Sequence, residues 1–199
     1  MKPYYQDDFA TIYHGDCREI LPRLPKFDMV VTDPPYGIGF ASQPTNYQRA
    51  AGMKPEQWDD VRIELPPFNA DTIVIWGGNY FALPISRGWL SWYKPDVPPS
   101  MGNVELAWTN KDRNCRQINH SIAATNAERV GHPTQKPLAV MLWTLSQFPE
   151  CKTILDPYMG SGTTLRAAKD LGRQCVGIEI NEHYCELAKR RLSQEVFAL

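Results

Sequence analysis

The stretch ILDPYMGSGTTLRAAKDLGRQCVGIEI near the end of the sequence constrains the fold more than any other feature. It predicts a buried strand over 153–156, a glycine-rich turn, a helix over 163–171 and a second strand over 174–178. Two successive strands joined through a helix run parallel in one sheet. The stretch therefore predicts an α/β fold, with a mostly parallel sheet that carries helices on both faces.

The rest of the chain continues this alternation. Apolar or alternating runs predict strands over 11–14, 27–32, 72–76, 88–93 and 105–109, and helical spacing predicts helices over 18–24, 137–147 and 182–194. Two polar excursions interrupt the pattern, at about 37–69 and 110–131. We expect a single domain over 1–199, because this length suffices for one buried core.

Composition limits where the protein works and what it binds. No segment has the length and apolarity of a membrane span or a secretory signal, so we expect a folded protein that is not inserted in a membrane. Five cysteines without a C-x-x-C pair favour reduced thiols in the cytoplasm, and we expect no metal. The net charge of −1 weighs mildly against a nucleic-acid partner, so DNA contacts would need a local basic patch.

The glycine-rich turn has the pattern of a nucleotide-cofactor site. Gly160 and Gly162 lie between a strand and a helix, where they let the backbone approach a ligand, and Glu179 ends the next strand, where a carboxylate can accept bonds from ribose hydroxyls. An ordinary strand-to-helix turn is the alternative. The turn lacks the third glycine of a dinucleotide fold, and Asp156 would repel a pyrophosphate. A cationic cofactor, S-adenosylmethionine, suits this carboxylate better.

The sequence Asp33-Pro34-Pro35-Tyr36 directly follows a predicted buried strand, at the edge where ligands of open α/β sheets bind. An exocyclic amine of a base is a poor nucleophile, and two acceptors for its two hydrogens favour its attack on a methyl donor. The Asp33 side chain and the Pro34 carbonyl can supply them on a stiff rim. Tyr36 offers a face for base stacking. A proline-rich turn with a capping aspartate is the alternative.

Together these motifs resemble the amino-group DNA methyltransferases, in the subgroup whose DPPY catalytic motif precedes the cofactor motif. The resemblance implies a Rossmann-like S-adenosylmethionine-dependent methyltransferase fold with circularly permuted motif order, in which residues 33–36 hold and stack a flipped base. It also implies that 1–199 is one catalytic domain. The implied cofactor-binding residues are Asp16, Cys17, His132, Thr134, Lys136, Asp156, Pro157, Gly160, Ser161, Gly162, Thr163, Glu179 and Ile180.

The chain departs from this family in size, because little of it remains for a separate target-recognition domain. The best DNA-binding candidates lie in the second polar excursion and are the residue types that read base edges or clamp phosphates: Lys111, Arg113, Asn114, Arg116 and Arg129. A solvated polar loop is an equally good interpretation. The first excursion, which contains Tyr47, Arg49, Lys54 and Trp58, is a second candidate and could act as a lid.

We therefore expect a site-specific methyltransferase that acts on N6 of adenine in double-stranded DNA and works as a homodimer. N4 of cytosine is the runner-up, although Asp at the first motif position is typical of the adenine enzymes. Two interpretations from other classes stay open. A dinucleotide-dependent oxidoreductase would explain the glycine turn but leaves Asp33 without a task, and a catalytically silent DNA-binding module would predict a weakened cofactor pocket.

Overall fold

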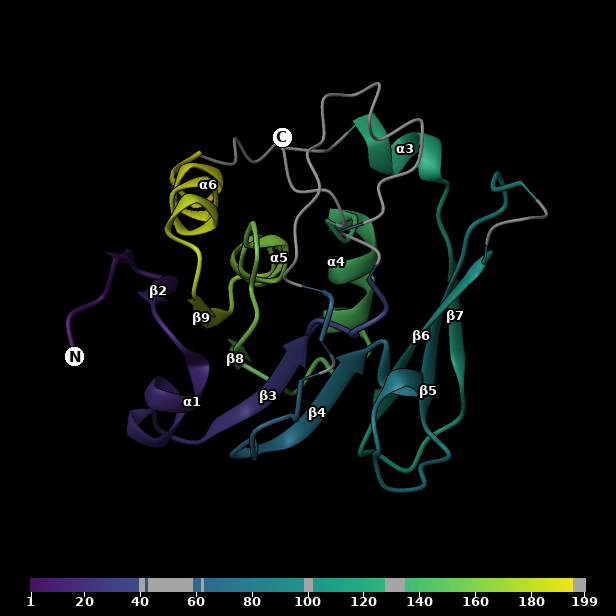
Figure 1. Ribbon diagram of the computed structural model, residues 1–199, viewed down its shortest axis with the longest axis horizontal. Helices are drawn as coiled ribbons and strands as arrows, with labels where there is room; N and C mark the ends of the chain where they lie inside the picture. The colour runs from purple at the N-terminus through teal and green to yellow at the C-terminus, as the bar shows by residue number, and fades with distance from the viewer. Residues whose placement is uncertain (40–41, 43–58, 62, 99–101, 128–134, 195–199) are drawn as a thin grey trace.

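A computed structural model describes residues 1–39, 42, 59–61, 63–98, 102–127 and 135–194. Its nine-stranded sheet has the order β1-β2-β9-β8-β3-β4-β6-β5-β7 (Figure 1). The strands are β1 Tyr5–Gln6, β2 Ala10–His14, β3 Phe27–Thr32, β4 Ala70–Trp76, β5 Trp89–Tyr93, β6 Val104–Thr109, β7 Arg116–Asn119, β8 Thr153–Asp156 and β9 Gln174–Glu179. The helices are α1 Cys17–Ile20, η1 Leu21–Arg23, η2 Gly78–Tyr80, α3 Ile122–Ala127, α4 Leu138–Ser146, α5 Thr163–Asp170 and α6 Glu182–Ser193.

The sheet is mostly parallel, as the sequence predicts. Strands β2, β9, β8, β3 and β4 run parallel to one another, and β6 is inserted antiparallel between β4 and β5. The carboxyl ends of the five parallel strands therefore share one edge of the sheet. Because β6 runs the other way, its first residues lie at this edge and its last residues lie at the opposite edge.

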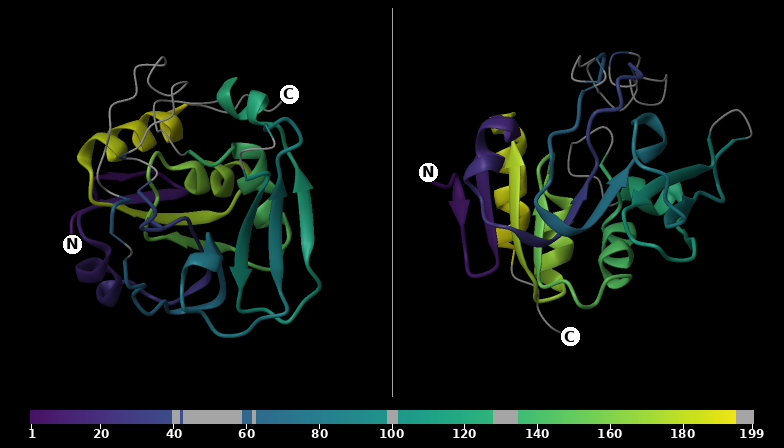
Figure 2. Two further views of the ribbon diagram at one scale, coloured as in Figure 1. Left: turned by 45° about the vertical axis from the view of Figure 1, so that its right-hand side comes forward. Right: turned by 90° about the horizontal axis from the view of Figure 1, so that it is seen from below.

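Helices cover both faces of the sheet, because successive strand residues point to opposite sides. Met29 and Val31 of β3 join the apolar cluster beneath α4, α5 and α6, whereas Val30 belongs to the cluster on the α1 side. Figures 1 and 2 show the three long helices on one side of the sheet and α1 on the other. The predicted α/β fold with helices on both faces is confirmed. No helix in the described ranges is long and apolar enough to cross a membrane.

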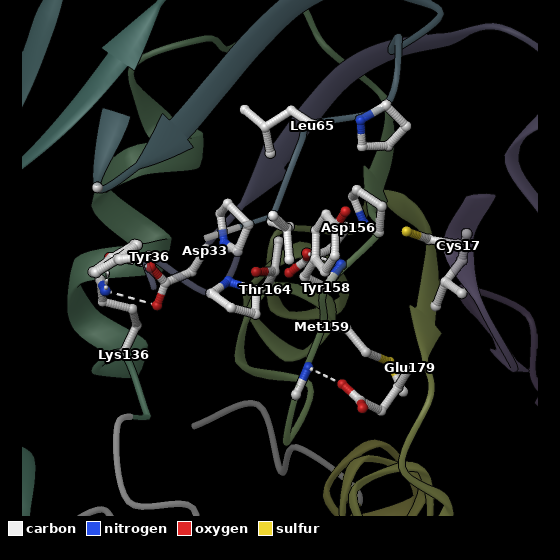
Figure 3. A pocket seen from close by; sticks show the side chains of 18 of the residues that line it. Cys17, Asp33, Tyr36, Leu65, Lys136, Asp156, Tyr158, Met159, Thr164 and Glu179 are labelled. Carbon is white, nitrogen blue, oxygen red and sulfur yellow. Dashed lines mark hydrogen bonds and ion pairs between the residues drawn. The ribbon is translucent and has the colours of Figure 1, made fainter. Parts of the chain in front are cut away.

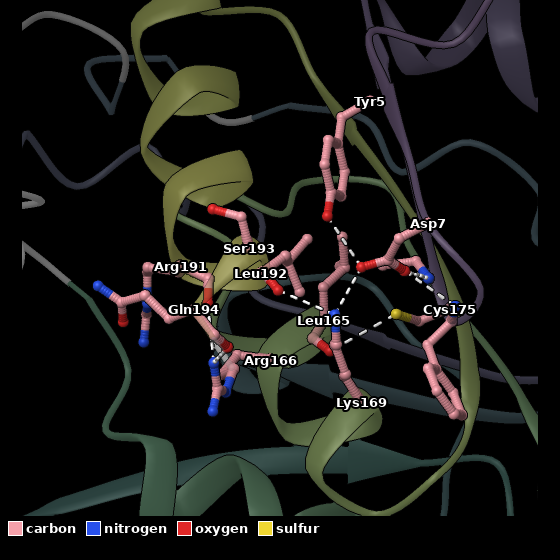
Figure 4. Close-up of polar contacts among 12 residues, drawn as sticks. Tyr5, Asp7, Leu165, Arg166, Lys169, Cys175, Arg191, Leu192, Ser193 and Gln194 are labelled. Atoms are coloured by element: carbon pink, nitrogen blue, oxygen red, sulfur yellow. Dashed lines mark hydrogen bonds and ion pairs between the residues drawn. The ribbon is translucent and has the colours of Figure 1, made fainter. Parts of the chain in front are cut away.

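The end of α6 is fixed by cations from α5 (Figure 4). Lys169 donates to the carbonyl of Leu192 at 2.9 Å, and its Nζ also lies 2.5 Å from Asp7 Oδ2. Arg166 donates to the carbonyl of Arg191 at 2.8 Å. The last carbonyls of a helix have no partner within the helix, so these bonds satisfy them and join the two C-terminal helices.

Two elements lie where the sequence indicates only a polar excursion. Strand β7 is the outermost strand of the sheet and pairs with β5, and α3 follows β7 in the chain. Asp96 accepts from the N–H groups of Ile122 and Ala123, at 2.7 and 2.9 Å. Ser121 Oγ also accepts from the Ala124 N–H at 3.1 Å, so the start of α3 is capped both by the serine next to it and by an aspartate 26 positions earlier in the chain.

Candidate active site

A cleft of about 1670 Å³ opens at the carboxyl edge of the parallel strands. It brings together the ends of β2, β3, β8 and β9, from opposite halves of the chain (Figure 3). The predicted residues that line it are Asp16, Cys17, Asp33, Pro34, Pro35, Tyr36, Lys136, Asp156, Pro157, Gly160, Ser161, Thr163, Glu179 and Ile180. Gly162 lies just behind this lining. His132, Thr134 and Arg129 fall outside the described residues.

The glycine turn depends on backbone shapes and contacts that side chains would disturb. Gly160 and Gly162 have φ of +50° and +77°, in the left-handed region that favours glycine. A Cβ on Gly162 would come within 2.7 Å of the Ala188 Cβ on α6. The need for glycine at 162 therefore combines backbone conformation with helix packing, and the turn itself contacts the cleft through Gly160.

Glu179 ties the turn to the end of β9. Its Oε2 accepts from the Gly160 N–H at 3.0 Å, and its Oε1 accepts from the Asn181 N–H at 2.8 Å (Figure 3). Burial raises the pKa of Glu179, although these backbone hydrogen bonds oppose the rise. Each carboxylate oxygen has a second lone pair, so the group can still accept bonds from a pair of hydroxyls in the cleft.

Arg191 of α6 anchors the other side of the turn. Its Nη1 lies 2.9 Å from Thr163 Oγ1 and 3.2 Å from Ser161 Oγ. The Ser161 hydroxyl is also 3.4 Å from Gln135 Oε1. The turn is thus held between α6 and the segment just before α4, and the latter carries Lys136.

Asp156 is a buried carboxyl at the end of β8, with 2 % of its surface exposed. It accepts from Thr32 Oγ1 at 2.9 Å and from the Tyr158 N–H at 3.1 Å. Burial raises its pKa to about 7, although hydrogen bonds from Thr164 and Thr32 oppose the rise. A positively charged ligand would stabilise the ionised form, because a nearby opposite charge favours ionisation.

The far end of the cleft is formed by the turn after β2. Asp16 caps α1 by accepting from the Arg18 N–H at 2.8 Å, and it also pairs with the Arg18 guanidinium. The Tyr158 hydroxyl is hydrogen-bonded to the buried Cys17 thiol. Sequence reasoning did not select Tyr158, although an aromatic residue inside the glycine-rich turn was a usable signal.

At the other end, Lys136 lies between two carboxylates. Its Nζ is 2.7 Å from Asp33 Oδ2 and 3.0 Å from Glu105 Oε2, and Lys94 pairs with the other oxygen of Glu105. The Lys136 side chain is 8 % exposed. Burial would raise the pKa of Glu105, but the two ammonium groups outweigh it and lower this pKa to about 2. The four groups form a chain of alternating charge that begins at Asp33.

The structure gives Lys136 partners that the resemblance does not name, while its role at the cofactor stays a prediction. The expectation places it at the methionine end of the cofactor, whereas the structure pairs its ammonium with Asp33 and Glu105. A buried ammonium needs carboxylate partners, and these two carboxylates supply them. Because their sequence positions are far from 136, no spacing in the sequence signals this contact.

The backbone after Asp33 is fixed by a second aspartate that sequence reasoning missed. Asp59, buried in the described part of the first excursion, accepts from the N–H groups of Tyr36 and Gly37 at 2.8 and 2.9 Å. The Tyr36 hydroxyl donates to Asp33 Oδ1 and lies 3.2 Å from Lys136 Nζ. Together with the two prolines, these bonds restrict the conformation of the 33–36 segment.

The predicted DNA-binding residues of the second excursion lie far from Asp33. Lys111, Arg113 and Asn114 follow the end of β6, at the edge of the sheet opposite the cleft. The Arg113 guanidinium donates to the Gln147 carbonyl at 2.9 Å and lies over the Phe148 ring. A six-residue strand spans about 20 Å, so these side chains cannot contact a base that is held at Asp33.

Arg116 begins β7 opposite Leu90, which also places it toward the edge away from the cleft. The direction of β6 was not readable from the sequence, and the assignment of these residues to DNA stays a prediction. Glu105, at the start of the same strand, is the residue of this region that reaches the cleft.

Comparisons with known proteins identify the family and the fold. A family model described as DNA methylase (N6_N4_Mtase) matches residues 91–190. The chain is 28% identical to the Type II methyltransferase M.ScaI of Streptomyces caespitosus, over 100% of this chain and 86% of that protein. It is 25% identical to the Type II methyltransferase M2.LlaDCHI of Lactococcus lactis subsp. cremoris, over 97% and 93% of the two chains.

Two solved structures share the fold. The crystal structure of M1.HpyAVI superposes with a TM-score of 0.55 and 27% identity, over 94% of this chain and all of that one. The PvuII DNA methyltransferase, described as cytosine-N4-specific, gives a TM-score of 0.63 at 17% identity, over 99% and 91% of the two chains. With the family match over half of its length, the chain belongs to the N6/N4 DNA methylase family.

Proposed function

We propose that this DNA methyltransferase transfers a methyl group from S-adenosylmethionine to N6 of adenine in double-stranded DNA. The observation that carries the proposal is the meeting of Asp33 and the glycine turn in one cleft, although they lie at opposite ends of the chain. Asp at position 33 supports adenine, as the family resemblance implies. The M1.HpyAVI-SAM complex, solved for a protein of the same fold, supports the choice of cofactor.

The acidic acceptor groups of the cleft fit S-adenosylmethionine, which would supply a methyl group from a positively charged sulfur. Glu179 would accept from the ribose hydroxyls, and the buried Asp156 would face the ammonium of the methionine part. Asp16 would face the adenine ring. Gly160 exposes backbone to the ligand because it carries no side chain. The side chains of Glu179, Asp156 and Asp16 are all acidic. They therefore suit a cationic cofactor and disfavour the pyrophosphate of a dinucleotide.

Asp33 acts on the target amine. An ionised carboxylate has about four lone-pair positions, and Lys136 and the Tyr36 hydroxyl use two of them. One remaining position would accept one amine hydrogen, and the Pro34 carbonyl would accept the other. S-adenosylmethionine would supply the methyl group and take back the electron pair of its C–S bond as the thioether leaves. The nitrogen lone pair would form the new N–C bond, and the surplus amine proton would pass to the Asp33 carboxylate that already accepts it. Preorganised acceptors of this kind stabilise the positive charge that develops on nitrogen.

The buried charge chain holds the Asp33 carboxylate in a fixed position. Lys136 holds the Asp33 carboxylate in place, and Glu105 offsets the positive charge of Lys136 from the other side. A paired network of this kind avoids the cost of a buried, uncompensated charge. Lys136 and Glu105 are therefore positioning residues, while Asp33 is the residue that contacts the amine.

The same acceptors could hold the N4 amine of cytosine, which is the second candidate. The cytosine-N4-specific PvuII enzyme has the same fold, and this similarity keeps the candidate open. In either case the base must leave the duplex, at a cost of a few kcal/mol that is smallest for mismatched bases. Methyl transfer accounts for Asp33 and the glycine turn together, which neither an oxidoreductase nor a silent DNA-binding module does.

The DNA-contacting surface and a homodimer remain proposals. Residues 111–116 lie at the far edge of the sheet, so DNA would approach from the cleft side and from the segments that border it. A homodimer would pool two modest surfaces of a nearly neutral chain. Sedimentation velocity with and without DNA tests this proposal, and monomer alone in both samples would contradict it.

The substitution Asp33→Asn tests the catalytic assignment. The protein is incubated with S-adenosylmethionine labelled in its methyl group and with unmodified DNA, and label is counted in the DNA. The amide would keep the shape of the side chain but lose the charge, so we expect label transfer to fall at least ~100-fold while cofactor affinity stays within about threefold. Asp71→Asn, an exposed aspartate at the opposite edge of the sheet, is the matched control. Substantial transfer by the Asp33 variant would remove Asp33 from the mechanism.

A further inference from the structure

The ring of Tyr36 is already stacked on another aromatic ring. Its centroid lies 4.8 Å from that of Tyr80, and the two planes differ by 17°. Phe81 approaches the same ring edge-on at 6.5 Å. A Cβ on Gly77, which has a φ of +67°, would come within 2.0 Å of the Tyr36 ring. Glycine at 77 therefore lets the turn after β4 close onto Tyr36.

Tyr36 also has a fixed orientation toward Asp33. Its hydroxyl donates to Asp33 Oδ1 and lies 3.2 Å from Lys136 Nζ, so the ring extends away from the carboxylate that would hold the target amine. A base that stacks on this ring with its amine at Asp33 must lie parallel to the ring and beside it. In the structure, Tyr80 is the ring that lies parallel to Tyr36 and covers one of its faces.

The position of Tyr80 would allow its ring to move away from Tyr36. It ends η2, a three-residue turn, and its N–H donates to the Gly77 carbonyl at 2.9 Å. Tyr80 lines the cleft and the residue is 38 % exposed, so part of it already contacts solvent. Moving this ring outward would disturb neither the sheet nor the charge chain at Lys136.

We propose that Tyr80 occupies the stacking place of the target base in the free protein and leaves it when the base enters. Tyr80 is then a specificity-determining residue, because an entering base must stack on Tyr36 better than Tyr80 does. Base–aromatic stacks are stronger than most pairs of aromatic side chains, so the exchange favours a correctly placed base. This inference rests on the proposed function, because it assumes that a flipped base contacts Tyr36.

A graded set of substitutions tests the exchange through the KM for DNA. Unmodified plasmid DNA is methylated by wild type and by Tyr80→Ala, Tyr80→Phe and Tyr80→Trp. We expect Tyr80→Ala to lower the KM by about 2- to 10-fold, since the competing stack is gone. Tyr80→Phe keeps the ring and should match wild type, whereas the larger ring in Tyr80→Trp should raise the KM. An unchanged or raised KM for Tyr80→Ala would overturn the proposal.

A spectroscopic measurement follows the ring itself. Fluorotyrosine placed at position 80 should change its ¹⁹F resonance to that of a solvent-exposed ring when target DNA is added. A resonance that does not move in the saturated complex would overturn the proposal, even if the alanine variant is unstable. Failure of the proposed function has a different signature, because wild type itself would then transfer no methyl to DNA, and the inference about Tyr80 would fall with it.

Discussion

The affinity for S-adenosylmethionine should depend on pH through Asp156. This carboxyl has a pKa of about 7 in the ligand-free protein because it is buried, and only its ionised form can pair with the cofactor ammonium. As the pH falls below 7, the proton must be removed before binding, at a cost of about 1.4 kcal/mol per pH unit. Between about pH 7.5 and 5.5 we therefore expect the affinity to fall by about 25-fold.

Isothermal titration calorimetry across this range measures the effect. In Asp156→Asn the binding is weaker and the slope disappears, because no proton is exchanged at position 156. Burial also raises the pKa of Glu179, so Glu179→Gln is titrated in parallel to separate the two carboxyls. A constant affinity in wild type, or the same slope in Asp156→Asn, would refute the assignment of Asp156 to the ammonium.

The sign of the effect reverses for folding without cofactor. The folded pKa of Asp156 lies above its unfolded value of about 4, so the folded state holds its proton more tightly between about pH 4 and 7. The stability that the protonated form contributes is lost as the pH rises through this window. Urea denaturation of wild type and Asp156→Asn should thus differ in slope against pH. Parallel stability curves for the two proteins would contradict the raised pKa.

Two further substitutions test the site and the fold. In Glu179→Gln only one side-chain oxygen is left for two backbone N–H groups. We therefore expect the free energy of unfolding of the ligand-free protein to fall by about 1–3 kcal/mol and the cofactor affinity to fall about 5- to 150-fold. Calorimetry measures both quantities, and Glu182→Gln, exposed on α6, should change neither. Hydrogen bonds from Lys169 and from backbone N–H groups outweigh burial and lower the pKa of Asp7 to about 2, so Asp7 contributes stability above about pH 4 that is lost as the pH falls toward 2. Asp7→Asn should cost about 2–3 kcal/mol at about pH 7 in urea denaturation, and the neighbouring Asp8→Asn is the control. Equal stability of the two variants would contradict this role.

The sequence predicted the parallel part of the sheet well, because its strands are buried on both faces. Strand β3, Phe27–Thr32, and strand β8, Thr153–Asp156, form at the predicted residues. Strand β7 was missed because it is an edge strand in which only Ile118 is even partly buried, so it carries no apolar run. Edge strands of this kind take their structure from pairing with a neighbour, which a local pattern does not contain.

The candidate site was predictable where short motifs carry it. The glycine turn and the 33–36 segment are each recognisable from a few consecutive residues, and both line the cleft. The partners of Lys136 were not predictable, because Asp33 lies 103 positions away and the contact depends on sheet order. The direction of β6, which places residues 111–116 away from the cleft, was not predictable either, and their contact with DNA stays a prediction.

The identity of the modified base tests the central claim most directly. Unmodified DNA is incubated with the protein and S-adenosylmethionine, digested to nucleosides and analysed by mass spectrometry, with Asp33→Asn as the control. We predict N6-methyladenine in the wild-type sample and its near absence with the variant. N4-methylcytosine as the product would contradict the choice of base, and DNA without either modified base would contradict the proposed function as a whole.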